Sequence, residues 1–335
     1  MYDIIFFMEN VLVTGGAGLI GSHLCDKLIK ENYHVACIDN FITGRPENIA
    51  HLASNKNFKF VKADVSGPPA SYQLPARNRY AQGVAGGPAT SYRFIFHLAS
   101  PASPKGYMDH PIETYRVNSF GTNHLLKFAK KQKARFLFAS TSEVYGDPKV
   151  HPQPETYWGN VNPVGIRACY DESKRFGEMV CKIFERKHKL DVRIARIFNT
   201  YGPRNDPQDG RVIPNFIIQA IKNKPMTVYG DGAQTRSFCY VSDLVEGLYK
   251  LMFKKGLKGQ VINLGNPEEF TVLELANKIK KATDSKSKII FTKKPEDDPN
   301  RRKPDIKKAK KKLAWQPKIS LDKGLRPTID YFKNL

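Results

Sequence analysis

Cysteines are few in this sequence, and none are closely spaced. Five occur among 335 residues, and no two have the Cys-x-x-Cys spacing. A disulfide framework needs a dense, even-numbered set of cysteines, and a structural zinc site needs closely spaced ligands. The pattern argues against both, so we expect no metal site and a reducing, cytoplasmic compartment.

Long apolar runs are also missing. A membrane-spanning helix needs roughly 20 apolar residues, whereas the apolar N-terminal stretch YDIIFFM, residues 2–8, is much shorter and lacks a basic flank. We therefore expect a soluble chain with no membrane contact. Met8, which ends this stretch, is an alternative start of the natural chain.

Acidic residues are scarce relative to basic ones, with 32 against 54 and a net charge of +22 at pH 7. Such an excess is one sign of nucleic-acid binding. The densest basic run, 301–315, has helix-forming composition, and no zinc-finger spacing or aromatic-rich strand accompanies it. We expect a solvated lysine surface that steers a small anionic ligand, and no nucleic-acid partner; polyanion binding is the least favoured alternative.

One segment, 66–93, lacks the lysines of its surroundings. From Gly67 to Arg93 there is no lysine and no acidic residue, and glycine, proline, alanine and serine predominate in most of it. Long loops without structure are uncommon in compact domains. A lid or partner loop is one interpretation; we favour a disordered insertion, or an error in the gene model, with no catalytic role. Limited proteolysis tests this, since a rigid, uncut loop would contradict it.

What the sequence does contain is the alternation of an α/β fold. Residues 10–40 follow the pattern strand, glycine turn, helix, strand, which is typical of one βαβ unit. Further strands and helices are expected at 58–64, 93–100, 134–141 and 191–199, and at 113–133 and 171–188. This alternation predicts a Rossmann-like, doubly wound parallel sheet.

The glycine turn predicts a dinucleotide site. Gly15, Gly18 and Gly21 follow a strand and open a helix, where the backbone approaches a pyrophosphate closely. Asp39 ends the next strand; a carboxylate there binds the ribose hydroxyls and repels a 2′-phosphate, which favours NAD over NADP. Asp64 either binds adenine or caps its strand. The predicted cofactor site also includes Leu19, Ile20, Asn40 and Leu98.

Two domains are therefore expected. Residues 1–199 form the NAD-binding domain, with 66–93 as an atypical insertion. Residues 200–335 form mainly a smaller α/β substrate-binding domain, with some elements returning to the large one.

Tyr170 and Lys174 lie four residues apart in RACYDESKR, at the start of a helical pattern. Such a spacing places both on one helix face, but it recurs by chance on solvated helices. Together with HLASPASPKGYM, ASTSEVYGDP, RIFNTYGPR and DGRVIPNFI, however, the sequence resembles the extended short-chain dehydrogenase/reductases of nucleotide sugars, and among them the UDP-glucuronate decarboxylases. The resemblance runs from 11–24 to 324–332. Leu19 and Ser173 depart from it, standing where phenylalanine and glycine are usual.

The resemblance implies that Tyr170 takes a proton from a sugar hydroxyl, that Lys174 holds the nicotinamide ribose, and that Thr141 bonds the reacting oxygen. Lowering a tyrosine pKa from about 10 to 7 takes roughly 4 kcal/mol. One ammonium at about 4 Å supplies about that much at an effective dielectric of 20. We therefore expect Lys174 to lower the pKa of Tyr170.

Electron flow explains why oxidation precedes loss of CO2 in this chemistry. Direct decarboxylation of glucuronate leaves a carbanion at C5 with no electron sink. A ketone at C4 is such a sink, so decarboxylation then leaves an enolate instead. Protonation at C5 and return of the hydride then give UDP-xylose, with NAD regenerated.

The run Thr141-Ser142-Glu143 favours a decarboxylase, because related 4,6-dehydratases carry an aspartate at the position of Ser142. By the same resemblance, Glu143 handles a proton near C5. Arg302 in NRRKPD matches an arginine near the sugar carboxylate, where a guanidinium binds in bidentate fashion; the alternative is a tail charge beside its basic neighbours.

The resemblance also places UDP beside Asn199, Arg211 and Arg236, for which surface ion pairing is the alternative. It implies a homodimer paired through the helices at 113–133 and 171–188. Other functions remain open: release of the UDP-4-keto-pentose with NADH, another nucleotide-sugar epimerisation or dehydration, or a nucleotide-sensing binding protein. Any turnover excludes the last.

Overall fold

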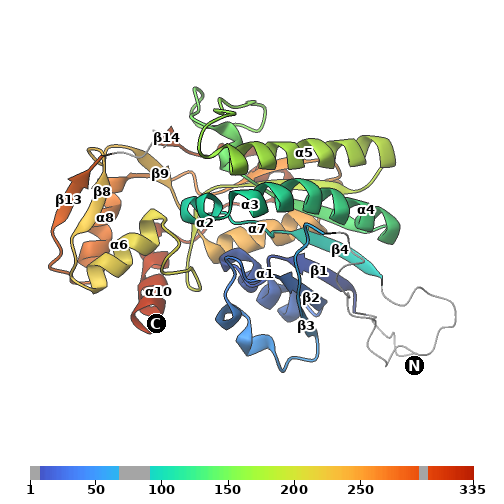
Figure 1. The fold of residues 1–335 in the computed structure, drawn as a ribbon, viewed down its shortest axis with the longest axis horizontal. Coiled ribbons are helices and arrows are strands. Elements are labelled where there is room, and N and C mark those ends of the chain that lie inside the picture. The colour runs from blue at the N-terminus through green and yellow to red at the C-terminus, as the bar shows by residue number, and fades with distance from the viewer. Residues whose placement is uncertain (1–7, 68–90, 294–300) are drawn as a thin grey trace.

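A seven-stranded parallel sheet forms the centre of the fold (Figure 1). The computed structural model describes residues 8–67, 91–293 and 301–335; positions 1–7 and most of the predicted insertion, 68–90, lie outside them. The strand order is β11-β6-β5-β4-β1-β2-β3, and all neighbouring strands are parallel. The strands are β1 (Asn10–Thr14), β2 (His34–Asp39), β3 (Phe58–Lys62), β4 (Tyr92–His97), β5 (Arg135–Thr141), β6 (Val192–Ile197) and β11 (Val261–Leu264). The predicted Rossmann-like sheet is confirmed.

Helices cover both faces of this sheet, which is why its strands are apolar almost throughout. Val11 and Val13 of β1 pack against the helices on one face, whereas Leu12 between them packs against the helices on the other. The helices of the first face are α1 (Leu19–Lys30), α7 (Val241–Phe253) and α9 (Lys307–Leu313). Those of the second are α3 (Pro111–Arg116), α4 (Thr122–Gln132) and α5 (Ala168–His188). Figure 1 shows the two layers on opposite sides of the sheet.

A third hydrophobic core lies at the C-terminal side, where Phe216, Leu275 and Ile329 are buried together. Its helices are α6 (Val212–Ile221), α8 (Val272–Ala282) and α10 (Leu321–Lys333), which group at one end of the molecule in Figure 1. The short strands nearby are β7 (Thr200–Tyr201), β8 (Met226–Tyr229), β9 (Thr235–Ser237), β10 (Cys239–Tyr240), β12 (Glu269–Thr271), β13 (Ile289–Thr292) and β14 (Arg301–Arg302). Because β11 and α7 belong to the large sheet and its cover, the chain crosses between the two parts more than once. The domain division at residue 200 stays a prediction.

The predicted helix at 113–133 is not a regular α-helix. A π-helical turn, Val117–Gly121, separates α3 from α4. Two side chains bond across its ends: the Thr122 hydroxyl of α4 donates to the Asn118 carbonyl over 2.7 Å, and the Ser119 hydroxyl donates to the Tyr115 carbonyl of α3. Such side-chain bonds compete with the backbone ladder, which is the physical reason for the irregular turn.

Within the part of the chain that the structure describes, no helix has both the length and the apolar character required to cross a membrane. The same residues contain no group of three or more His, Cys, Asp or Glu side chains arranged to hold a metal ion.

Candidate active site

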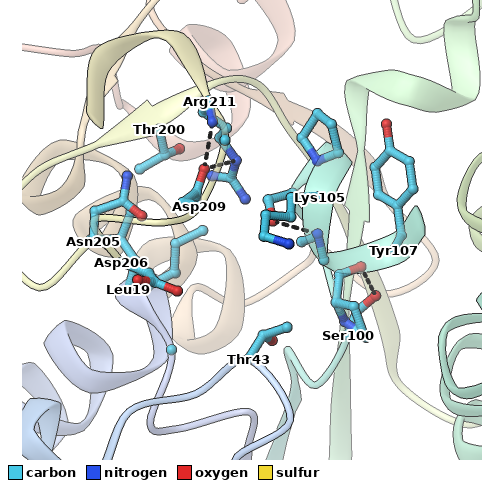
Figure 2. Close-up of a pocket in the computed structure, with 18 of the residues that line it drawn as sticks. Leu19, Thr43, Ser100, Lys105, Tyr107, Thr200, Asn205, Asp206, Asp209 and Arg211 are labelled. Atoms are coloured by element: carbon cyan, nitrogen blue, oxygen red, sulfur yellow. Dashed lines mark hydrogen bonds and ion pairs between the residues drawn. The ribbon is translucent and has the colours of Figure 1, made fainter. Parts of the chain in front are cut away.

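A large pocket of about 830 Å³ opens where the strands of the sheet end and meet the C-terminal elements. Figure 2 shows Leu19 of α1, Ser100 after β4 and Arg211 before α6 facing it from separate segments. Every residue that the sequence assigned to cofactor or substrate lines this pocket: Gly15, Gly18, Leu19, Ile20, Gly21, Asp39, Asn40, Asp64, Leu98, Thr141, Ser142, Glu143, Tyr170, Lys174, Asn199, Arg211, Arg236 and Arg302. Folding therefore brings the whole predicted set together.

The glycine loop is shaped by close backbone approaches. Gly15 has φ +75°, and a Cβ there would run into the backbone of Ala99. A Cβ on Gly21 would meet the Gly15 carbonyl, whereas Gly18, the N-cap of α1, has only ordinary contacts. The glycines therefore leave backbone without side chains at a helix N-terminus, which suits the close approach of a pyrophosphate. The residues present fit a dinucleotide.

Asp39 organises the same loop from the end of β2. Its Oδ2 accepts from the Ala17 N–H and its Oδ1 from the Phe41 N–H, both over 2.9 Å. Burial raises the pKa of this carboxyl, and these backbone bonds oppose the rise. Asp64 is exposed beyond the end of β3 and accepts from the Ser66 N–H over 2.8 Å, so it caps a turn.

Tyr170 is nearly covered, with 4% of its surface exposed. It lies in the first turn of α5, and its ring stacks on that of Tyr107 from α2 (Pro104–Asp109). Burial raises the pKa of Tyr170 to about 12, and a hydrogen bond with Thr141 only partly opposes this. The residues of this site therefore keep the phenol protonated at neutral pH.

Lys174 does not lower the pKa of Tyr170 in the way the sequence led us to expect. Its ammonium donates to the Ala139 carbonyl over 2.8 Å and lies 5.7 Å from the centroid of the Tyr170 ring. Burial lowers the pKa of Lys174 itself to about 7. Our expectation was wrong because it counted the attraction between the two groups but not the desolvation of each.

Glu143 lies between two guanidiniums. Arg302 donates to its Oε1 and Arg167 to its Oε2, and Arg302 also donates to the Gly146 carbonyl over 2.7 Å. Burial by itself would raise the pKa of Glu143, but Arg302 and Arg167 outweigh it and hold the pKa at about 2. Glu143 is therefore a carboxylate at neutral pH, and Arg302 is a buried side chain rather than a tail charge.

The other predicted substrate residues face the pocket from the C-terminal elements. Arg302 of β14 and Arg236 of β9 are paired neighbours in a small sheet. Arg211 caps α6, and its Nε lies 3.3 Å from Asp209 Oδ1, an interaction visible in Figure 2. Asn199 follows β6, and Ser142 is buried after β5.

Two residues of this site were not predicted. Tyr107 stacks on Tyr170, and Arg167 is paired with Glu143. Both lie inside stretches that carried the resemblance, Tyr107 in HLASPASPKGYM and Arg167 in RACYDESKR. Their positions in those stretches gave no sign of a role, since each contact joins segments distant in the sequence.

A glycine loop at the start of α1, with Tyr170 and Lys174 side by side on a helix against the sheet, defines the class of short-chain dehydrogenase/reductase folds. Within this class, the chain belongs to the GDP-mannose 4,6 dehydratase family, whose model matches residues 12–328.

Close relatives carry one activity in their names. The chain is 52% identical to UDP-glucuronic acid decarboxylase 1 of Arabidopsis thaliana, over 97% of this chain and 70% of that protein. It is 49% identical to UDP-glucuronic acid decarboxylase 1 of Danio rerio, over 97% and 72%. Among solved structures, UDP-glucuronic acid 4-epimerase from Bacillus cereus, in complex with UDP-glucuronic acid and NAD, is 31% identical with a TM-score of 0.83, over 97% of this chain and 99% of the other.

Proposed function

We propose that this protein is an NAD-dependent UDP-glucuronate decarboxylase that produces UDP-xylose. The observation that carries the proposal is the buried Arg302–Glu143 pair in the same pocket as Tyr170. A guanidinium placed there suits an acidic sugar. The identity to proteins named UDP-glucuronic acid decarboxylase supports the same substrate.

The cofactor site consists of the glycine loop and the strand ends around it. Gly15, Gly18 and Gly21 let the backbone approach the pyrophosphate, and Asp39 binds the adenosine ribose. Bound NAD supplies the acceptor for the C4 hydride, a positive charge near the phenol, and the hydride that later reduces the ketone. Leu19, Ile20, Asn40, Asp64 and Leu98 complete this part of the pocket wall.

Tyr170 moves the proton of the C4 hydroxyl. Its phenolate takes that proton as the alcohol is oxidised, and the resulting phenol returns it when the ketone is reduced. Thr141, hydrogen-bonded to Tyr170, holds the reacting oxygen. Because burial raises the pKa of Tyr170 to about 12, the phenolate would form only with the positive charge of a bound cofactor beside it, and Lys174 would hold the nicotinamide ribose there.

Arg302 orients the sugar carboxylate, and Glu143 fixes the guanidinium of Arg302. Arg211, Arg236 and Asn199 bind the UDP portion, with the two arginines at the diphosphate. After CO2 leaves, Glu143 relays a proton from solvent to C5. Because its pKa is held at about 2, Glu143 carries this proton only briefly.

We further propose a cytoplasmic homodimer. An apolar strip is exposed on neighbouring helices and comprises Met108, Ile112, Tyr115, Phe120, Phe176, Met179 and Ile183. These side chains lie on or beside α3 and α5, which contact each other. A contiguous exposed apolar strip marks an interaction surface.

All five cysteines are free, which suits a reducing compartment. Light scattering tests the dimer, and cell fractionation the location.

The decisive experiment mixes the full chain, NAD and UDP-glucuronate and follows the sugar nucleotide by mass. We expect UDP-xylose and CO2 without accumulation of NADH. Accumulation of NADH with a keto-pentose product indicates release of the intermediate. An unchanged mass with retained carboxylate indicates epimerisation or no turnover, and it would overturn the proposal.

A further inference from the structure

A second cavity of about 280 Å³ lies next to the candidate active site. Asp147, Asn160, Arg167, Asp171 and Arg302 are in its wall. Arg167 and Arg302 also line the main pocket, so the two cavities share two guanidiniums. A polar cavity of this size has room for several water molecules.

Asp171 is the carboxyl group of this cavity that is buried, with 7% of its surface exposed. Its Oδ2 lies 3.8 Å from the Nε of Arg167, the same arginine that binds Glu143. Its Oδ1 is buried and has no hydrogen-bond partner among the described residues, and the same is true of Arg302 Nε. A buried acceptor and a buried donor without partners thus belong to two residues that line one polar cavity.

Four charged groups meet here. Glu143 and Asp171 are the carboxyls, and Arg167 and Arg302 are the guanidiniums, so the charges of these four ion-paired groups sum to zero when both carboxyls are ionised. Arg236 also acts on Glu143, but the proposed function assigns its charge to the diphosphate. A sugar carboxylate beside Arg302 adds a third negative charge to a buried site. Uncompensated buried charge is costly, so one of the carboxyls is expected to bind a proton.

The two carboxyls differ in how readily they accept it. Arg302 and Arg167 hold the pKa of Glu143 at about 2. Burial, and next the charge of Glu143, raise the pKa of Asp171 to about 7 against the opposing effect of Arg167. Asp171 lies farther from Arg167 than Glu143 does, and one of its oxygens has no hydrogen-bond partner among the described residues. Protonating Asp171 therefore costs less free energy than protonating Glu143.

We propose that Asp171 takes up one proton from solvent when an acidic nucleotide sugar binds beside Arg302, and that neutral nucleotide sugars bind without this uptake. The inference rests on the proposed function, which places a sugar carboxylate at Arg302. Asp171 is a positioning residue, since it acts through Arg167 and Glu143. Its protonation keeps the buried set neutral and leaves both guanidiniums engaged by carboxylates.

The pH dependence follows from the groups around Asp171. These are Glu143, Arg167, Arg302, Glu172, Tyr107, Tyr170, Cys169 and, across the cavity, Asp147. At pH 6 Asp171 already carries its proton, so binding takes up little. At pH 8 it is ionised before binding, and the uptake approaches about one proton per site.

Isothermal titration calorimetry in two buffers of different ionisation enthalpy, phosphate and imidazole, measures this uptake. The Tyr170→Phe chain with NAD is titrated, because its turnover is expected to be at least about 100-fold slower. We expect uptake with UDP-glucuronate at pH 8, little uptake at pH 6, and none with UDP-xylose at either pH. Equal uptake for the two ligands, or no uptake at pH 8, would overturn the inference.

Variants assign the proton to a residue. Adding Asp171→Asn to the Tyr170→Phe chain is expected to abolish the proton uptake. Asp147 lines the same cavity but is exposed, so adding Asp147→Asn is expected to leave the uptake unchanged. Asp171→Glu retains a titratable group and should keep it. Uptake that persists in Asp171→Asn would assign it elsewhere. If that variant does not fold, the ligand and pH comparison in the Tyr170→Phe chain still decides. CO2 release by the unmodified enzyme is measured separately, so failure of the proposed function is distinguished from failure of this inference.

Discussion

Tyr107 lies flat against Tyr170, with ring centroids 5.0 Å apart and an angle of 8° between the planes. The guanidinium of Arg167 lies 5.8 Å from the centroid of the Tyr107 ring. Stacking from α2 therefore covers one side of the phenol that carries the proposed proton transfer. It helps to fix the orientation of the Tyr170 ring, in addition to the hydrogen bond between Tyr170 and Thr141.

Replacing Tyr107 with leucine is expected to lower kcat up to about ten-fold, because a stacked pair contributes about 0.5–1.5 kcal/mol beyond its burial. Tyr107→Phe keeps the stack and loses only a hydroxyl that has no partner among the described residues. It should retain kcat within about two-fold. Steady-state rates at saturating UDP-glucuronate test this, and equal rates for the two variants would contradict a stacking role.

Tyr170→Phe is expected to lower turnover by about 10²–10⁴-fold, the usual contribution of a positioned acid or base. Binding of NAD should change little, since the phenol is assigned to the sugar hydroxyl. Single-turnover assays and calorimetric titration with NAD measure the two effects separately. Full activity in this variant would refute the assignment of Tyr170 as the base.

Arg302→Ala is expected to weaken binding of UDP-glucuronate more than ten-fold and to affect UDP-glucose much less. It should also destabilise the fold by about 1–3 kcal/mol, because Glu143 loses one of its two guanidinium partners and keeps Arg167. Binding titrations and denaturant unfolding check these results. Arg301→Ala is the matched control, since that arginine is adjacent in β14 but exposed. Equal losses for both sugars would remove Arg302 from carboxylate recognition.

Gly21→Ala is expected to lower the melting temperature of the cofactor-free chain by several degrees, since its Cβ would collide with the backbone at Gly15 and Gly16. Gly18→Ala, in the same loop, meets only the Gly15 carbonyl at 3.4 Å and should change the melting temperature little. Differential scanning calorimetry compares the pair. Similar melting temperatures would show that the loop relaxes around either side chain.

The local elements of the large sheet were predictable because their signals are local. Residues 10–14, 19–30 and 34–39 form the expected strand, helix and strand, since continuous apolar runs and one glycine turn specify them. The π-helical turn at Val117–Gly121 was not predicted. It depends on side-chain bonds to individual carbonyls, which do not alter the hydrophobic period.

The sequence by itself determined the parallel α/β fold, the family and the residue types available for chemistry, because periodicity and short motifs are encoded within neighbouring residues. Only the tertiary structure decided the charge states. The pairing of Glu143 with Arg302 and Arg167 and the stacking of Tyr107 on Tyr170 join distant segments. Burial there raises the pKa of Tyr170, opposite to the direction expected from its spacing to Lys174, and lowers the pKa of Lys174, because desolvation depends on everything packed around a group.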